Sequence, residues 1–173
     1  MKACAILLLC AAALAADKPP ISAASMTLAA QRLDNKLGTV DEAVQPVGVT
    51  QGTYIGGFGV VFVGSVSLAP MAGITPFHQS ISKAEYARVR QKKLERLPKL
   101  RQVIQEQLLN MAASLDTVPA DDQIAISVAL FSFSGEDNTG IPSQIVMHAP
   151  RKVLVDMQTG RVTDRSAIRA EEF

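Results

Sequence analysis

Two repeating patterns of apolar residues divide the chain into helical and extended segments. Between residues 25 and 36, apolar side chains recur at three-to-four spacing, which is typical of a helix buried along one face. Residues 44–55 and 58–68 are instead rich in β-branched and aromatic side chains. Because Gly56 and Gly57 separate these segments and tolerate positive φ angles, we predict a β-hairpin with a tight two-residue turn.

The second arm of this hairpin has two different faces, since side chains along a strand alternate between the two sides of a sheet. One face is apolar and is expected to be core; besides Gly64 it carries Val60, Phe62, Val66 and Leu68. The other face is apolar near the turn and polar beyond it, and it carries Val61, Val63, Ser65 and Ser67. We therefore expect another part of the molecule to cover some of this second face.

A long amphipathic helix is predicted to begin after Ser82. Ser82 and Glu85 have the spacing of a capping box, in which each side chain accepts a hydrogen bond from the backbone of the other. An apolar stripe follows at helical spacing and consists of Tyr86, Leu97, Ile104, Leu108, Met111 and Leu115, flanked by Leu94 and Leu100. Pro98 interrupts this pattern, so the helix either bends there or divides into two.

The C-terminal third predicts a second hairpin. Residues 124–130 alternate between apolar and small side chains, and the extended pattern continues to Phe133. The loop 134–142 contains glycines and an asparagine, so residues 143–148 are expected to pair back as a strand.

Two structures remain open for the segment after Pro150. Pro at the start and Gly160 at the end favour a short helix over residues 151–158. The alternating apolar residues of the same segment equally allow a hairpin that turns at 158–160. Residues 167–173 are predicted to form a last strand.

These elements predict an α+β fold. It is a two-layer sandwich in which an antiparallel sheet is covered by one long amphipathic helix, with an extra helix and strand at its N-terminal end. From Phe58 onward the order is β-α-β-β-α-β, the split βαβ arrangement of ferredoxin-like folds. Residues 25–173 are expected to form this single domain, with the leucine stripe of the long helix on the core face of 124–130.

The first 16 residues have the pattern of a signal peptide. Lys2 supplies a charged start, residues 3–14 an apolar segment, and Ala15 or Ala16 a small residue for cleavage. We therefore expect an exported protein that is periplasmic or secreted after cleavage.

Residues 17–24 contain two prolines and are expected to form a linker. Both cysteines, Cys4 and Cys10, lie within the predicted signal peptide, so the mature chain would contain neither a disulfide nor a thiol. A lipid anchor on Cys10 is the alternative, although Leu9 is bulky where a lipidation signal requires a small residue.

Charge is distributed very unevenly along a chain whose formal net charge is only +1. That net charge argues against general nucleic-acid binding. Residues 43–82 contain no Asp, Glu, Lys or Arg. The predicted long helix then has eight cations and only Glu85 and Glu95 as acids in its first part; the cations are Lys83, Arg88, Arg90, Lys92, Lys93, Arg96, Lys99 and Arg101.

The uncharged stretch allows two other interpretations. Residues 54–71 are apolar enough for a membrane helix followed by a basic segment, which would make the protein a membrane-tethered structural protein. Glycines, β-branched residues and the period of two favour strands instead. Residues 56–59 are also rich in glycine, but neither a Lys-Ser or Lys-Thr pair nor a helix follows them directly, so a turn is favoured over a phosphate-binding loop.

No motif assigns a catalytic residue, a metal ligand or a cofactor. His78 lies in the irregular connection before the long helix and His148 at the end of a strand, and neither has a metal-ligand spacing. The alternative function is a small hydrolase or metal-dependent enzyme that uses these two histidines with a loop carboxylate. The adjacent acids Glu136 and Asp137 favour a solvated turn over a calcium loop.

The basic helix is the charged feature with a clear pattern, and it supplies the candidate binding residues Arg88, Arg90, Lys92, Lys93 and Arg101. Arg88, Lys92 and Lys99 face outward together, where they could contact an anionic surface or form an ordinary solvated face. Arg90, Lys93 and Arg101 lie on or beside the apolar stripe. They must extend to solvent, pair with an acid or border a binding groove, because an unpaired buried cation is costly.

The run Thr53–Phe62 and the later run Lys93–Pro98 resemble exported bacterial proteins to which no activity is assigned. This resemblance covers most of the mature chain and implies no catalytic residues. Residues 155–162 also resemble the closing hairpin of small exported PepSY-type regulatory domains. We therefore expect a non-enzymatic binding module of the cell envelope with an unknown protein or small-molecule partner.

Overall fold

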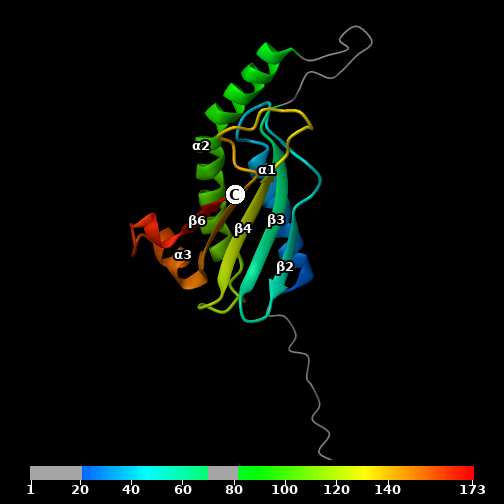
Figure 1. The fold of residues 1–173 in the computed structure, drawn as a ribbon. Coiled ribbons are helices and arrows are strands. Elements are labelled where there is room, and N and C mark those ends of the chain that lie inside the picture. Colours follow the sequence, from blue (N-terminus) through cyan, green and yellow to red (C-terminus); the bar gives the residue numbers. More distant parts are fainter. Residues whose placement is uncertain (1–20, 70–81) are drawn as a thin grey trace, which may run out of the picture.

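Three helices and six strands follow one another in the computed structural model, which describes residues 21–69 and 82–173 (Figure 1). In chain order these elements are α1 (Ala23–Leu37), β1 (Gln45–Pro46), β2 (Gln51–Ile55), β3 (Gly59–Ser67), α2 (Lys83–Ser114), β4 (Gln123–Leu130), β5 (Gln144–Pro150), α3 (Arg151–Gln158) and β6 (Arg169–Glu172). A short 3₁₀ turn, η1 (Arg165–Ala167), precedes β6. The predicted α+β fold is confirmed.

The strands form one mixed sheet in the order β1-β3-β4-β5-β6, with β2 also paired to β3. Strands β3 and β4 are parallel, and Val60 pairs with Ile124 in their register. All other pairs of described strands are antiparallel. The antiparallel sheet predicted from the sequence is therefore wrong, because α2 carries the chain back and β4 starts at the same end of the sheet as β3.

The ferredoxin-like arrangement is not confirmed. The order β-α-β-β-α-β is present from Gly59 onward, but a split βαβ unit has another strand between its two parallel strands. Here β3 and β4 are direct neighbours, and β5 and β6 follow on the far side of β4.

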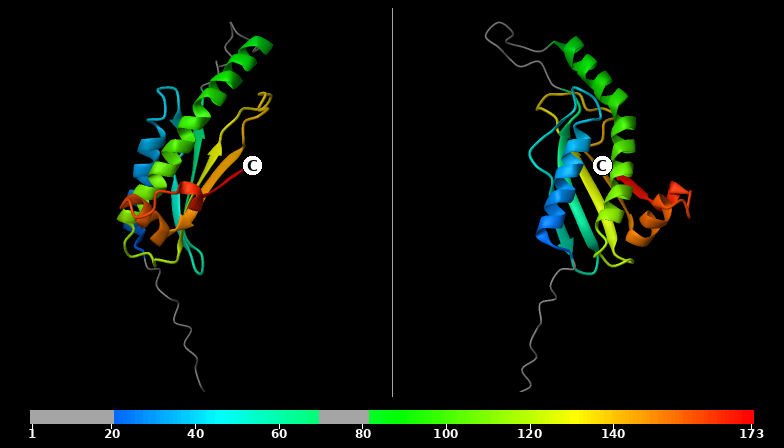
Figure 2. Two further views of the ribbon diagram at one scale, coloured as in Figure 1. Left: turned by 90° about the vertical axis from the view of Figure 1, so that its left-hand side faces the viewer. Right: turned by 180° about the vertical axis from the view of Figure 1, so that it is seen from behind.

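Helices α1 and α2 lie together on one face of the sheet and enclose the core (Figure 2). The predicted core faces are confirmed, since Val60 and Phe62 of β3 and Ile126 of β4 are fully buried. The apolar stripe of α2 is buried from Leu97 onward. Ile104, near the middle of this stripe, has no exposed surface.

The opposite face of the sheet has no helix on it in the described part of the chain (Figure 2). Val63 is 48% exposed there, so the cover expected for this face is not found among residues 21–69 and 82–173. Ala125 and Ser127 of β4 are nevertheless buried, because they are small and lie between larger neighbours on β3 and β5.

The first hairpin differs in detail from the prediction. Ile55 pairs with Gly59, so the connection has three residues rather than the two glycines alone. Gly57 and Gly59 both have positive φ, which explains why glycine is needed at two positions of this turn. The predicted first arm is interrupted at Gly48, also at positive φ, and divides into β1 and β2.

Helix α2 begins as predicted and continues through Pro98 without dividing. The capping box is confirmed, because Ser82 N donates to Glu85 Oε2 at 2.8 Å and Glu85 N donates to Ser82 Oγ at 3.2 Å. The side chain of Pro98 faces solvent, and the missing N–H there is tolerated because the apolar contacts after it hold the helix on the sheet.

The C-terminal elements follow the predicted order. Residues 151–158 form helix α3, so the alternative hairpin is wrong for this segment. Strand β4 ends at Leu130 rather than continuing to Phe133. At the other end of the domain, α1 already begins at Ala23, inside the predicted linker.

The membrane-helix interpretation of residues 54–71 is wrong for the part that the structure describes, since residues 54–67 form the end of β2, a turn and β3. In residues 21–69 and 82–173, no helix combines the length and apolar composition that crossing a membrane requires. The predicted signal peptide and His78 lie outside the described residues.

Candidate functional site

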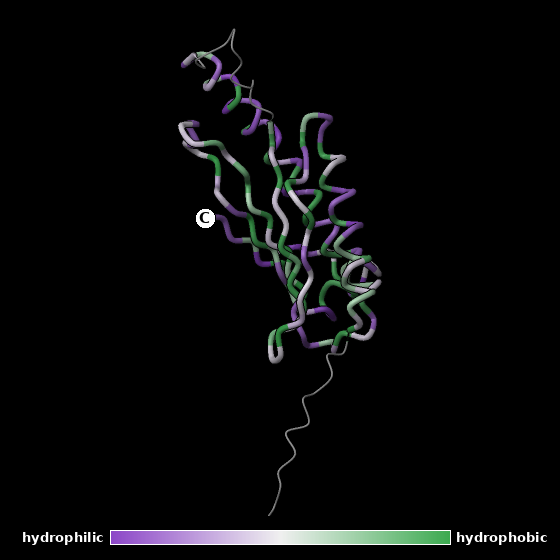
Figure 3. The backbone as a smooth tube through the Cα atoms, turned by 90° about the vertical axis from the view of Figure 1, so that its right-hand side faces the viewer, coloured by the Kyte–Doolittle hydropathy of each residue, from purple (hydrophilic) through white to green (hydrophobic). Residues whose placement is uncertain are grey.

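The N-terminal end of α2 extends beyond the sheet, and much of it is hydrophilic (Figures 1 and 3). Residues 83–101 of α2 contain eight cations. Within the described residues, four of them form ion pairs with other parts of the same chain, and four do not. This division decides which cations are available to a partner.

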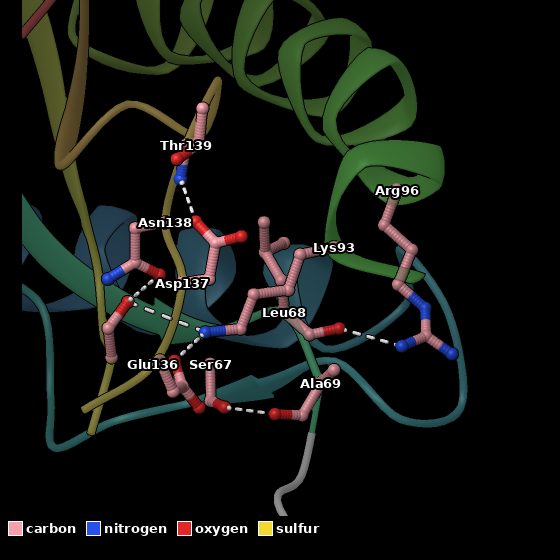
Figure 4. A network of polar contacts seen from close by, with 10 residues as sticks. Ser67, Leu68, Ala69, Lys93, Arg96, Glu136, Asp137, Asn138 and Thr139 are labelled. Atoms are coloured by element: carbon pink, nitrogen blue, oxygen red, sulfur yellow. Dashed lines mark hydrogen bonds and ion pairs between the residues drawn. The ribbon is translucent and has the colours of Figure 1, made fainter. Parts of the chain in front are cut away.

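Arg90 and Lys93 both contact the loop between β4 and β5, and Figure 4 shows the contacts of Lys93. Arg90 Nε donates to the carbonyl oxygen of Thr139 at 2.8 Å and lies 3.7 Å from Asp137 Oδ2. Lys93 forms an ion pair with Glu136. These contacts hold the loop against α2.

The Lys93–Glu136 pair is almost completely buried, with each side chain 3% exposed. Lys93 Nζ also donates to Ser132 Oγ at 3.4 Å, and that hydroxyl donates to Asn138 Oδ1 at 3.1 Å. The solvated turn predicted for Glu136 and Asp137 is therefore wrong for Glu136. Sequence neighbours alone do not reveal that a cation on the apolar stripe reaches this loop.

Arg96 connects α2 to both ends of the first hairpin. Its Nη2 lies 2.7 Å from Asp41 Oδ1, and its Nη1 donates to the carbonyl oxygen of Leu68 at 2.8 Å. A hydrogen bond from the Ala43 amide and the charge of Arg96, with a smaller effect of Lys92, hold the pKa of Asp41 below its ordinary value of 3.8.

Arg101 joins α2 to the last strand through a two-pronged ion pair with Glu172. Its Nε donates to Oε1 at 2.6 Å and its Nη2 donates to Oε2 at 2.8 Å. The hydrogen bonds from Arg101 lower the pKa of Glu172 from its ordinary value of 4.5, and the same bonds raise the pKa of Arg101. Arg90, Lys93 and Arg101 thus pair with acids of their own chain, one of the three outcomes expected for them.

The remaining cations of α2 are exposed and form no ion pair with any residue in 21–69 or 82–173; they are Lys83, Arg88, Lys92 and Lys99. Arg88, Lys92 and Lys99 lie within about 40° of one another around the helix axis, at 100° per residue. Glu95 lies on the same side, where it accepts a hydrogen bond from Gln91 Nε2 at 3.0 Å. We call Arg88, Lys92 and Lys99 the cationic row.

His148 lies half-buried on β5, on the sheet face without helices. Its Nδ1 is 3.1 Å from Gln123 Oε1, and its ring is tilted against Phe58 with 6.3 Å between ring centroids. Asp122 instead accepts a hydrogen bond from the Tyr54 hydroxyl at 2.8 Å. Within the described ranges, no group of three or more His, Cys, Asp or Glu residues is placed to hold a metal ion.

No protein-family model, curated protein or solved structure matches the chain. The site must therefore be interpreted from its own chemistry. Sequence reasoning found the basic helix and its outward row, but it missed the acids that engage Arg90, Lys93 and Arg101. The position of Lys93 and Arg101 beside the apolar stripe was the signal that partners had to exist.

Proposed function

We propose that the protein is an exported, non-enzymatic binding module of the cell envelope that attaches to an anionic surface through the cationic row. The observation that carries this proposal is the division of cations on α2. Arg88, Lys92 and Lys99 are exposed and form no ion pair within the described residues, although four neighbouring cations are paired internally. Export is supported by the signal-peptide pattern of the first 16 residues.

The geometry favours attachment by charge rather than by insertion. The apolar stripe of α2 is buried against the sheet from Leu97 onward, and Tyr86 and Leu94 before it are half-buried, so the exposed side of the helix is mainly polar. A Lys or Arg near an anionic membrane contributes about 1 kcal/mol. The row should therefore support weak, reversible binding that salt weakens by screening.

Co-sedimentation with lipid vesicles tests this proposal. The test variant is Arg88→Gln/Lys92→Gln, and the matched control is Arg32→Gln/Lys36→Gln, which removes an exposed Arg and Lys at the same spacing from α1. We expect binding to vesicles that contain phosphatidylglycerol and not to neutral phosphatidylcholine vesicles. Loss of two contacts of about 1 kcal/mol each should weaken binding roughly 30-fold in the test variant.

The control should bind within about twofold of the unaltered protein, and high salt should release the unaltered protein. Equal losses in both variants would show that net charge alone determines binding. Equal binding to neutral and anionic vesicles, or no binding to either, would contradict the proposed role of the row.

A further inference from the structure

A hollow of about 430 Å³ lies away from the cationic row, where strands β5 and β6 meet the start of α3 and the turn η1. Its volume falls within the range of small-molecule sites, which is about 300–1,000 Å³. Its wall combines apolar and polar side chains, among them Pro150, Val153 and Ala167 on the apolar side and Gln123, His148 and Arg169 on the polar side. Such a wall can hold the body of a ligand and orient one polar group.

The register of β5 and β6 places two of the polar residues of the hollow side by side. His148 of β5 pairs directly with Arg169 of β6, so their side chains leave the sheet on the same face. The ring of His148 is held by Gln123 and Phe58.

Arg169 has no ion pair with any acid in the described residues. The acidic residues near Arg169 either bind other groups or form no ion pair with it. Asp164, just before the turn, accepts hydrogen bonds from the backbone N–H and the hydroxyl of Ser166 at 2.9 and 2.6 Å. Glu172 on the same strand is held by Arg101. Glu171, two residues along on the face of Arg169, forms no ion pair with it.

We propose that this hollow binds a small organic carboxylate, whose carboxylate group pairs with Arg169 while its apolar body lies against Val153, Pro150 and Ala167. A guanidinium presents two parallel N–H donors that match the two oxygens of a carboxylate. A guanidinium that has no acidic partner in the described chain, at the rim of a partly apolar hollow, is therefore suited to this class of ligand. The site is independent of the row on α2, so either proposal can fail alone.

NMR titration of ¹⁵N-labelled protein with benzoate tests the inference, with benzamide as a neutral probe of the same shape. Benzoate should shift the amide signals of Val153, Ser166 and Ala167 in a saturable way, and benzamide should not. The Arg169→Gln variant should bind benzoate at least tenfold more weakly. Arg169→Lys keeps the charge but loses the paired donors, so its benzoate affinity should lie between those of the unaltered protein and Arg169→Gln.

Arg32→Gln, at an exposed arginine on α1, should leave benzoate binding unchanged. Arg169 is exposed on β6, so its variants are expected to keep the overall spectrum of the folded protein. Equal shifts with benzamide, unaltered benzoate affinity in Arg169→Gln, or shifts confined to residues outside the hollow would each overturn the proposal.

Discussion

The buried pair of Lys93 and Glu136 shows how one side chain can determine the position of a whole loop. Both groups are removed from water, so each must offset the cost of burying the other's charge. Of the two carboxylate oxygens of Glu136, Oε1 has no hydrogen-bond partner among the described residues. The buried charge of Glu136 is therefore compensated mainly by Lys93.

Replacing one member of this pair should be much more damaging than replacing both. Lys93→Met leaves a buried carboxylate without its cation, and we expect the free energy of unfolding to fall by about 3–5 kcal/mol. Lys93→Met/Glu136→Leu removes both charges and should restore most of that loss. Urea unfolding at neutral pH measures both values.

Arg88→Gln serves as a control, because Arg88 is exposed and its replacement should change stability by less than about 0.5 kcal/mol. If the single and double variants lost the same stability, the ion pair would not be what holds the loop.

Much of each element could be predicted from local sequence, whereas the pairing of elements could not. The capping box at Ser82 and the apolar stripe of α2 act within one helix, so spacing along the chain reveals them. The strand that pairs with β4 cannot be identified in this way. Its buried face, from Ile124 to Leu130, has the same apolar pattern whether or not β3 pairs directly with β4, so the sequence does not separate a mixed sheet from an antiparallel one.

The same difference between local and long-range features separates the binding features that the sequence predicts from those that it does not. The exposure of Arg88 and Lys92 depends only on the angle around the helix, which the sequence determines. The hollow beside Arg169 depends on the register of β5 with β6 and on where η1 lies, and both are long-range features.

The last strand is attached to α2 by a contact that depends on pH. Arg101 lowers the pKa of Glu172 below 4.5, so the carboxylate binds its proton less readily in the folded protein than in the unfolded chain. The stabilisation is complete above the unfolded value and is lost as the pH falls through the lower, folded value. Since both side chains are more than a third exposed, the pair contributes at most about 1 kcal/mol.

Glu172→Gln should therefore be less stable than the unaltered protein at pH 7 and nearly equal to it at a pH well below 4.5. Denaturant unfolding at both pH values measures the difference. Glu171→Gln is the neighbouring control, because Glu171 has no ion pair among the described residues. A difference that persisted unchanged in acid would exclude the ion pair as its cause.

At the scale of the whole molecule, the helices of the described residues cover only one face of the sheet (Figure 2), and the cationic row lies on the exposed side of α2. The cations beside the core pair with acids of the same chain, and we propose that the cationic row contacts an external surface. We therefore expect the protein to attach to the periphery of an anionic membrane, and we expect this attachment to depend on the cationic row.

Fractionation of bacterial cells that express the full chain examines export and attachment together. We predict a processed protein that lacks residues 1–15 or 1–16, sediments with envelope membranes at low salt, and is released by a high-salt wash because salt screens the attraction. The Arg88→Gln/Lys92→Gln variant should already be released at low salt. Retention through an alkaline carbonate wash, or an unprocessed protein in the cytoplasm, would contradict the proposed function.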